Sequence, residues 1–417
     1  MTRTRGDRLK RARRTARRGV AVYILVLGVA TILAMTGFTL LSVARANHRI
    51  HDSLQKSLQA QCVAQAGIEK AFNYMYANPT WRQTMPNGNW FTNQAFGAGE
   101  YAVRATDSDG SLADDEGDAL TLTSSGRVGD AAHKVKVTLA PRPHPALAFA
   151  AFGYYQAGVR TNAVIQGPMR SNGSMWSDGN LDPGGNAFFE SLQGAYINSA
   201  LTPSRYASTS MSYPQPSLSS YLSLATPVTG TTGATAKLSK YVLTPTRNSE
   251  SSANVNANGI YSLDCSNRAV VIEKLRLKGT LIIHNTSQTV TFQHQLLIEP
   301  SGYSFPSILI FTNQSNVEFN LDQATFSESS DSMDYNEDGD KTDSPASSLK
   351  GIVWTDGSYI TIHRSSAGVT GCIIGGGIEV HDRAVIDDDP QLAQVMIPGF
   401  IDTSMKVIPG SWREEEP

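Results

Sequence analysis

An uncharged, apolar run near the start of the chain is the clearest pattern in the sequence. No charged residue occurs from Gly19 to Ala44. As an α-helix this stretch is roughly 39 Å long, at about 1.5 Å per residue, and a hydrocarbon core of about 30 Å needs about 20 apolar residues. Because a helix also pairs its own backbone groups in lipid, the pattern predicts a transmembrane helix over residues 19–44.

The hydrophobic pattern then continues with helical spacing over residues 45–79. Most apolar positions recur every three or four residues: Ile50, Leu54, Leu58, Cys62, Ile68, Ala71, Phe72 and Met75. Such spacing describes one face of an amphipathic helix, and Asn78-Pro79 ends it. We therefore predict one continuous helix from about Gly19 to Ala77, half in lipid and half outside, whose second half packs on its own domain.

Alternation with a period of two replaces the helical pattern in residues 80–141. The clearest alternating segments are Gly99–Arg104, Ala119–Thr123 and His133–Leu139, with a turn predicted over Gly126–Gly129. This is typical of a small antiparallel sheet, which would cover the outer half of the helix. Three prolines from Pro141 to Pro145 predict a short stiff linker over 142–146 and a domain boundary.

Residues 147–400 contain many short apolar runs bounded by Gly, Asn, Asp and Ser, without crossover helices. This pattern favours a β-solenoid, similar to a right-handed β-helix, and a β-sandwich is the alternative. Residues 205–255 are rich in Ser, Thr and Pro and are expected to form an extended or partly mobile insertion. Residues 401–417 are expected to be a tail. The predicted class is α+β, mostly β.

Charge distribution gives the helix an orientation. The first eighteen residues carry nine Lys and Arg and one acid, Asp7, although the net charge of the 417-residue chain is only −2. A basic leader (1–18) stays cytoplasmic, so we expect a single-pass protein of the cytoplasmic (inner) membrane with its C-terminal domains in the periplasm or at the cell surface. A nucleic-acid partner is not expected, because the apolar run follows the basic residues directly.

Composition adds two further constraints. Only 17% of residues are charged, below the roughly 25% of a typical soluble domain, and 35 are glycine, which suits turn-rich β-structure. The three cysteines, Cys62, Cys265 and Cys372, form neither a disulfide framework nor a metal-ligand spacing. For Cys265 and Cys372 the sequence allows two alternatives, a disulfide bridge between them or two buried thiols.

An acidic segment after residue 333 fits the first half of a calcium-binding loop. Its oxygen-bearing residues are Asp334, Asn336, Asp338, Asp340 and Asp343. The D-x-N-x-D-G order lets alternate oxygens converge on one cation, and Gly339 permits the sharp turn. Pro345 stands where such loops carry a bidentate Glu, and Asp343 would have to replace it. The sequence predicts either a structural Ca²⁺ site or a solvated acidic loop.

No catalytic motif is evident. The sequence has no G-x-S-x-G, H-E-x-x-H or P-loop, and its eight histidines are scattered. Asp387, Asp388 and Asp389 lie near Arg383, as acids and a base would in a carbohydrate-active β-helix enzyme. That is the enzymatic alternative; we expect a non-enzymatic protein.

The N-terminal region resembles type IV pilins, and in detail PilX-type minor pilins. The resemblance rests on the basic leader ending in Arg-Arg-Gly, the apolar helix and the segment AQAGIEKAFNYMYANPTW (64–81). It implies that a prepilin peptidase cuts after Gly19 to leave Val20 first. Most pilins carry Glu at the fifth mature position, where this chain has Ile24, so the resemblance implies a minor or priming role rather than a major subunit.

Phrases in the C-terminal region resemble bacterial families of anchored, PilX-like surface proteins of unassigned role. They are residues 166–173, 259–265, 277–281 and 349–354, and the tail phrases 398–400 and 407–412. Together the two resemblances imply a component of a type IV pilus or secretion-type assembly, whose partners are the membrane and other pilin-like subunits. A monomeric anchored surface or adhesion protein is the alternative.

Overall fold

The computed structural model describes residues 5–78, 80–160, 163–177, 187–189, 191–192, 205–206, 210–231, 233–312, 316–365, 367–381 and 383–415. The chain divides into two compact units. The first comprises Met1–Leu112, Leu120–Leu139 and Val407–Pro417, and the second comprises Ala113–Ala119 and Ala140–Lys406. One long helix and otherwise mostly β-structure make up these units, as the sequence patterns predict.

Helix α1 (Arg5–Ala77) is one uninterrupted element of 73 residues. Its hydroxyl side chains within the apolar run bond to carbonyls one turn earlier, as Thr31 does to Leu27 at 2.8 Å and Ser42 does to Phe38 at 2.9 Å. Such side chains need no partner outside the helix. The helix ends where the backbone and side-chain amides of Asn78 both donate to the Tyr74 carbonyl. The predicted continuous helix is confirmed.

The apolar side chains of the outer half of α1 divide into a buried and an exposed set. The buried set faces the sheet of the first unit and comprises Ala60, Val63, Ala64, Ile68, Ala71 and Met75. Ile50, Leu54 and Leu58 are instead 58–63% exposed, and Cys62 is exposed as well. The stripe that periodicity predicts as one face is therefore covered only in its second half, where α1 reaches the sheet.

The sheet of the first unit is antiparallel, with the order β1-β2-β3-β4. Its strands are β1 (Gly88–Phe96), β2 (Gly99–Thr106), β3 (Leu120–Val128) and β4 (Ala131–Pro143), preceded by the short helix α2 (Trp81–Thr84). Along β3, Leu120 and Leu122 are buried and alternate with more exposed residues, as period two requires. Sequence patterns predict the other three strands but not β1, whose polar residues show no regular alternation.

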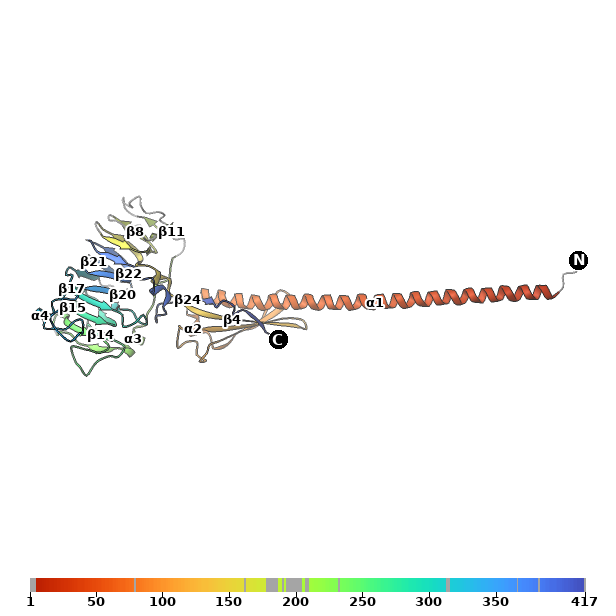
Figure 1. The fold of residues 1–417 in the computed structure, drawn as a ribbon, viewed down its shortest axis with the longest axis horizontal. Helices are drawn as coiled ribbons and strands as arrows, with labels where there is room; N and C mark the ends of the chain where they lie inside the picture. The colour runs from red at the N-terminus through yellow and green to blue at the C-terminus, as the bar shows by residue number, and fades with distance from the viewer. Residues whose placement is uncertain are drawn as a thin grey trace. The chain divides into compact units, whose positions relative to one another are not determined.

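Glycines allow α1 and β3 to approach closely (Figure 1). A Cβ on Gly67 would lie 2.2 Å from the Ser124 hydroxyl oxygen, and one on Gly126 would lie 2.3 Å from the Ala60 carbonyl oxygen. Real Cβ atoms do not approach this closely, so larger residues at either position would push the helix away from the sheet. Gly126 therefore lies within a strand, and the turn predicted over 126–129 comes later, at Gly129.

The second unit is built on a large parallel sheet of nineteen strands, counted over the described residues. Its strands run from β5 (Ala151–Val159) to β23 (Val385–Asp387) and include β6 (Val164–Gln166), β7 (Met169–Ser171), β8 (Ser174–Ser177), β9 (Ala187–Phe189), β10 (Ser191–Leu192), β11 (Arg205–Tyr206), β12 (Thr226–Val228), β13 (Thr235–Leu243), β14 (Ile260–Asp264), β15 (Ala269–Lys278), β16 (Thr280–Thr286), β17 (Val290–Glu299), β18 (Ile308–Thr312), β19 (Asn316–Leu321), β20 (Ser348–Thr355), β21 (Tyr359–Ser365) and β22 (Gly368–Val380). An antiparallel sandwich, the sequence-based alternative, is not what these described strands form.

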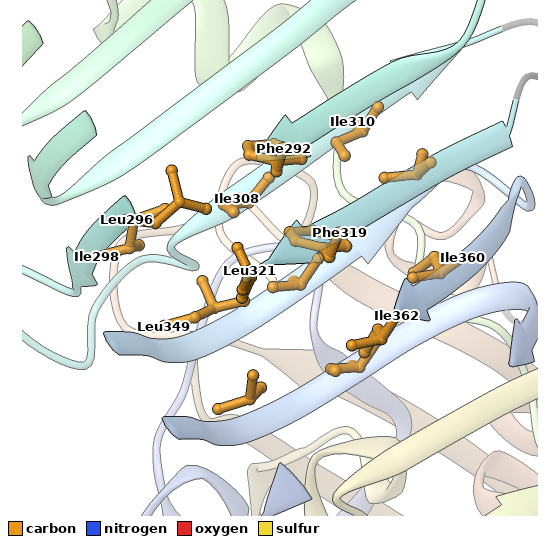
Figure 2. Packing of buried hydrophobic residues seen from close by; sticks show 14 of the residues in the cluster. Phe292, Leu296, Ile298, Ile308, Ile310, Phe319, Leu321, Leu349, Ile360 and Ile362 are labelled. Atoms are coloured by element: carbon orange, nitrogen blue, oxygen red, sulfur yellow. The ribbon is translucent and has the colours of Figure 1, made fainter. Parts of the chain in front are cut away.

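Strands in this sheet pair with the strand two positions along the chain. One series is β13, β15, β17, β19 and β21, and the other is β14, β16, β18 and β20. The register places like residues above one another, as in the column Ile272, Phe292, Phe319, Ile362 and Val380. All five side chains are buried, and Figure 2 shows three of them, Phe292, Phe319 and Ile362, in the core.

The first strands of the second unit join its last ones. Strand β5 pairs in parallel with β22, which places Val380 beside Val159 and Ile378 beside Ala157. In the same way β6 pairs with β23. The apolar columns therefore continue from residues late in the chain to residues near the start of the unit, an arrangement that no local pattern in the sequence reveals.

Segments expected to be irregular are ordered where the structure describes them. Residues 142–146 form the end of β4, past Leu139, the last β4 residue that pairs with β3, and the start of the 3₁₀ helix η1 (Pro145–Ala148), whose first position accepts proline. The 205–255 segment supplies β11, β12, β13 and the helix α3 (Leu218–Leu224), whose buried Tyr221 donates to the Pro398 carbonyl at 2.8 Å. Residues 193–204, 207–209 and 232 lie outside the description.

The expected tail is also structured. Strand β24 (Ile401–Val407) pairs with β4, and β25 (Arg413–Glu415) pairs antiparallel with it. Arg142 and Asp402, both in the second unit, form an ion pair at 2.7 Å. Charge pairing and backbone hydrogen bonds thus order a segment whose composition carries no strand signal.

Cys265 and Cys372 are free, buried thiols. They lie in different apolar clusters, and their sulfur atoms donate to the Leu263 and Ala146 carbonyls respectively. Of the two possibilities for this pair, the structure has buried thiols rather than a bridge.

Candidate functional site

Two features could carry a function: the exposed face of α1, and the acidic loop between β19 and β20. The predicted processing residues, Gly19 and Val20, both lie within α1, and Val20 is exposed. By length and composition, one helix in the described part of the chain could cross a membrane, Val20–Ala77, and a signal sequence would meet the same criterion. The large apolar side chains of its first half are exposed.

A groove continues this apolar face toward the sheet of the first unit. It measures about 750 Å³ and is lined by Leu54, Leu58 and Cys62 of α1 together with Phe96 and Val128 of the sheet. Phe96 is 51% exposed. An apolar groove beside a row of exposed leucines is a surface that another apolar helix could cover.

An ion pair holds the β3–β4 turn against α1 next to this groove. Lys56 donates to Asp130 at 2.8 Å. This hydrogen bond raises the pKa of Lys56 and lowers that of Asp130, so both groups stay charged. Because both are on the surface, the pair orients the turn more than it stabilises the unit.

The acidic loop is anchored to the sheet of the second unit by buried residues. Phe326 and Tyr335 pack against each other, with ring centroids 4.4 Å apart, and form a small core with Val242. Between them lies the short helix α4 (Glu328–Asp331). Burial alone would raise the pKa of Asp331, but the ammonium groups of Lys274 and Lys240, at 2.7 and 3.1 Å, outweigh it and lower that pKa.

Asp334, the first residue of the predicted calcium loop, shapes the turn. Its two carboxylate oxygens accept hydrogen bonds from the backbone amides of Glu337 and Gly339, at 2.6 and 3.2 Å. Its carboxylate also lies 3.9 Å from the Arg247 guanidinium. Gly339 has φ +100°, which a side chain would strain, so the predicted role of this glycine in the turn fits the backbone.

The remaining motif residues gather on the outer side of the loop. The Asn336 side-chain amide donates to Asp338 and Asp343, both at 2.9 Å. Hydrogen bonding to Asp338 raises the pKa of Asp343, and the backbone amide of Asp340 lowers that of Asp338. Carboxylates this close concentrate negative charge at one point of the surface.

A buried residue outside the motif joins this group. Oxygen atoms of Glu328, Asp340 and Asp343 all lie within 4.8 Å of one another. Glu328 has no exposed surface, and its Oε1 accepts from the backbone amides of Tyr335 and Asn336. No pattern in the sequence indicates Glu328, because it precedes the motif in a Ser-rich stretch without periodicity. Only chain folding returns it to the loop.

The acids of the enzymatic alternative are engaged in local structure. Asp387 ends β23, and Asp389 accepts from the Tyr303 hydroxyl at 2.9 Å and from the Gln391 backbone amide at 3.0 Å. Arg383 is placed in a left-handed backbone conformation just before the strand. The bond from the Gln391 amide to the Asp389 side chain is the local bond with which an Asp commonly stabilises a turn.

Strand stacking also brings together histidines that are scattered in the sequence. The rings of His363, on β21, and His381, which directly follows β22, lie 5.1 Å apart. His381 also lies 2.9 Å from Glu379, which bonds to the Tyr359 hydroxyl at 2.9 Å. Parallel register places them together, so spacing along the chain could not have indicated this cluster.

No protein-family model matches the chain, and no curated protein matches it. Among solved structures it is similar to the competence-associated pilin ComZ from Thermus thermophilus, with 11% identity, a TM-score of 0.34, and coverage of 86% of this chain and 98% of that one. It is also similar to an ice-binding protein from the Antarctic ascomycete Antarctomyces psychrotrophicus, with 11% identity, a TM-score of 0.22, and coverage of 58% and 95%. At these TM-scores neither likeness establishes a shared fold.

Proposed function

We propose that this chain is a non-enzymatic, membrane-anchored, pilin-like component of a type IV pilus or secretion-type assembly. Residues 19–44 cross the cytoplasmic membrane, the basic residues 1–18 stay in the cytoplasm, and the chain from residue 45 onward lies outside. The observation that carries the proposal is the continuity of α1, which passes without a break from an apolar, exposed half into a half packed on the first unit.

The exposed row on α1 supports assembly rather than simple anchoring. Anchoring needs apolar side chains only over the thickness of the hydrocarbon core, about 20 residues. Ile50, Leu54 and Leu58 lie beyond Ala44 and remain exposed beside the groove. When a second helix covers apolar side chains that are exposed to water, their burial stabilises the contact between the two helices. We assign this row to contact with other pilin-like subunits.

We infer that the second unit is a β-solenoid. The inference is supported by the pairing of strands two apart in the chain and by the in-register columns of buried residues. A solenoid stacks its coils to bury a core, so it can present a long outer surface to the exterior. Such a unit suits either a minor pilin or a monomeric anchored adhesin.

Processing of the N-terminus distinguishes the two. We expect mass spectrometry of the protein from its host to find Val20 as the first residue when prepilin peptidase is present, and an uncut terminus in a strain lacking that peptidase. A terminus that is the same in both strains would contradict the pilin-like assignment and favour the monomeric anchored protein. A phosphatase reporter fused after Pro417 should be active outside the cytoplasm; activity of a cytoplasmic reporter there would contradict the orientation.

A further inference from the structure

The carboxylate of Glu328 is buried and only half satisfied. The residue has no exposed surface, and its Oε2 has no hydrogen-bond partner in the described structure. Oε1, by contrast, accepts from the backbone amides of Tyr335 and Asn336 at 2.6 and 3.2 Å. A buried carboxylate with one free oxygen is unfavourable unless a proton or a cation compensates it.

The neighbours of Glu328 include further negative charge. Oxygens of Asp340 and Asp343 lie within 4.8 Å of it and of each other. Among the described residues, Lys274, Lys240 and Arg247 form their ion pairs with Asp331 and Asp334 instead. These three basic side chains are therefore engaged by acids other than Glu328.

The spacing fits one hard cation. Calcium binds carboxylate and carbonyl oxygens at about 2.3–2.6 Å, so two oxygens on the same ion lie at most about 5 Å apart. Three carboxylates within 4.8 Å satisfy that limit. Asp334 is different, because both of its oxygens already accept backbone amides within the turn.

We propose that Glu328, Asp340 and Asp343 bind one Ca²⁺ ion, with Glu328 as the buried ligand that connects the ion to the sheet of the second unit. Backbone carbonyls and water complete the shell, as in other oxygen sites. Bound calcium would hold the outer end of the loop, at Asp340 and Asp343, against α4 and the Phe326–Tyr335 core. Its role is structural.

The test uses the full-length chain in detergent, treated with EDTA and then titrated with CaCl₂ up to about 10 mM, since extracellular sites have dissociation constants of about 0.1–1 mM. Calorimetry should show a single site, and the melting temperature should rise by a few degrees at saturation. MgCl₂ over the same range should bind at least tenfold more weakly. No response to Ca²⁺, or equal binding of Mg²⁺, would overturn the proposal.

Variants locate the site. Asp343→Asn, which changes an exposed residue and leaves the fold intact, should weaken Ca²⁺ binding at least tenfold, as should Glu328→Gln. Asp334→Asn and Glu318→Gln, an acid on β19 away from the loop, should bind within about threefold of the wild type. The opposite result, in which Asp334→Asn loses binding and Asp343→Asn binds as the wild type does, would overturn the three-residue site. It would assign the ion to the D-x-N-x-D-G motif that begins at Asp334.

Discussion

Phe292 and Phe319 lie one above the other on the paired strands β17 and β19, with ring centroids 4.6 Å apart and ring planes within 4° of parallel (Figure 2). Both are buried. The stack arises because parallel strands in register repeat every side chain directly above its equivalent. Ile272 and Ile362 continue the same column on either side.

Removing one ring of this stack should destabilise the second unit strongly. We expect Phe319→Ala to lower its free energy of unfolding by about 3–5 kcal/mol, because the cavity is enclosed and its neighbours are held by the strand register. Urea denaturation followed by intrinsic fluorescence measures the change. Leu224→Ala, at a side chain 45% exposed in the same unit, is the control and should change stability by less than about 1 kcal/mol. Similar losses in both variants would contradict the columnar core.

Two stacked glycines, Gly351 and Gly371, lie within the paired strands β20 and β22. Gly371 has φ +139° and lies in register with Gly351, whose carbonyl oxygen would be 2.0 Å from a Cβ on Gly371. We expect Gly371→Ala to destabilise the protein by more than about 1 kcal/mol, because the backbone must move. Gly368→Ala, on the same strand with nothing within 4 Å, should be nearly neutral in a thermal melt. Equal melting temperatures for the two variants would argue against this close backbone approach.

A buried histidine makes stability depend on pH. His144 accepts from the Ala146 backbone amide at Nδ1 and contacts the Ser212 hydroxyl through Nε2, at 3.1 and 2.9 Å. The pKa of His144 is lowered to about 4, chiefly by burial; the Asp402 carboxylate opposes this shift and the Arg142 guanidinium adds to it. As pH falls below 6.5 the unfolded chain takes up a proton that the folded chain cannot, so stability should decrease between pH 6.5 and 4 by about 3 kcal/mol.

Melting temperatures measured from pH 7 to pH 4 test this dependence. His144→Gln keeps an amide near the same position but does not titrate, so its melting temperature should fall less over that range. The comparison concerns the slope and not the absolute stability, which the substitution also changes. Parallel pH profiles for the two proteins would show that another group controls the transition.

Cys62 reports on contact between α1 and a partner helix. It is exposed at the groove, whereas Cys265 and Cys372 are buried and serve as internal controls. Under the proposed function, a maleimide should label Cys62 slowly in cell envelopes and at least several-fold faster in the detergent-purified chain. Leu58→Asp should restore fast labelling in envelopes, because a charge in the row prevents packing. Equal labelling rates in envelopes and detergent would mean that this row is uncovered in the cell.

Local patterns predicted the elements whose stabilisation is local. The apolar run at 19–44 and the stripe that follows it predict α1, because helical periodicity can be recognised from residues a few positions apart. The alternation in residues 133–139 predicts β4 for the same reason. The Asp-x-Asn-x-Asp-Gly order predicted a tight acidic turn, since Gly339 and the side chain of Asp334 form it within a few residues.

Tertiary structure decided what depends on residues distant in the chain. The amino acid sequence determines the long helix, the short strands and the acidic turn, because each depends on neighbours a few positions away. Only the fold places β5 on β22, returns the tail to β4 as a strand, buries His144, and brings Glu328 to Asp340 and Asp343. Those pairings depend on stacking register and on the free energy gained by burying whole columns of side chains, which no short window of sequence contains.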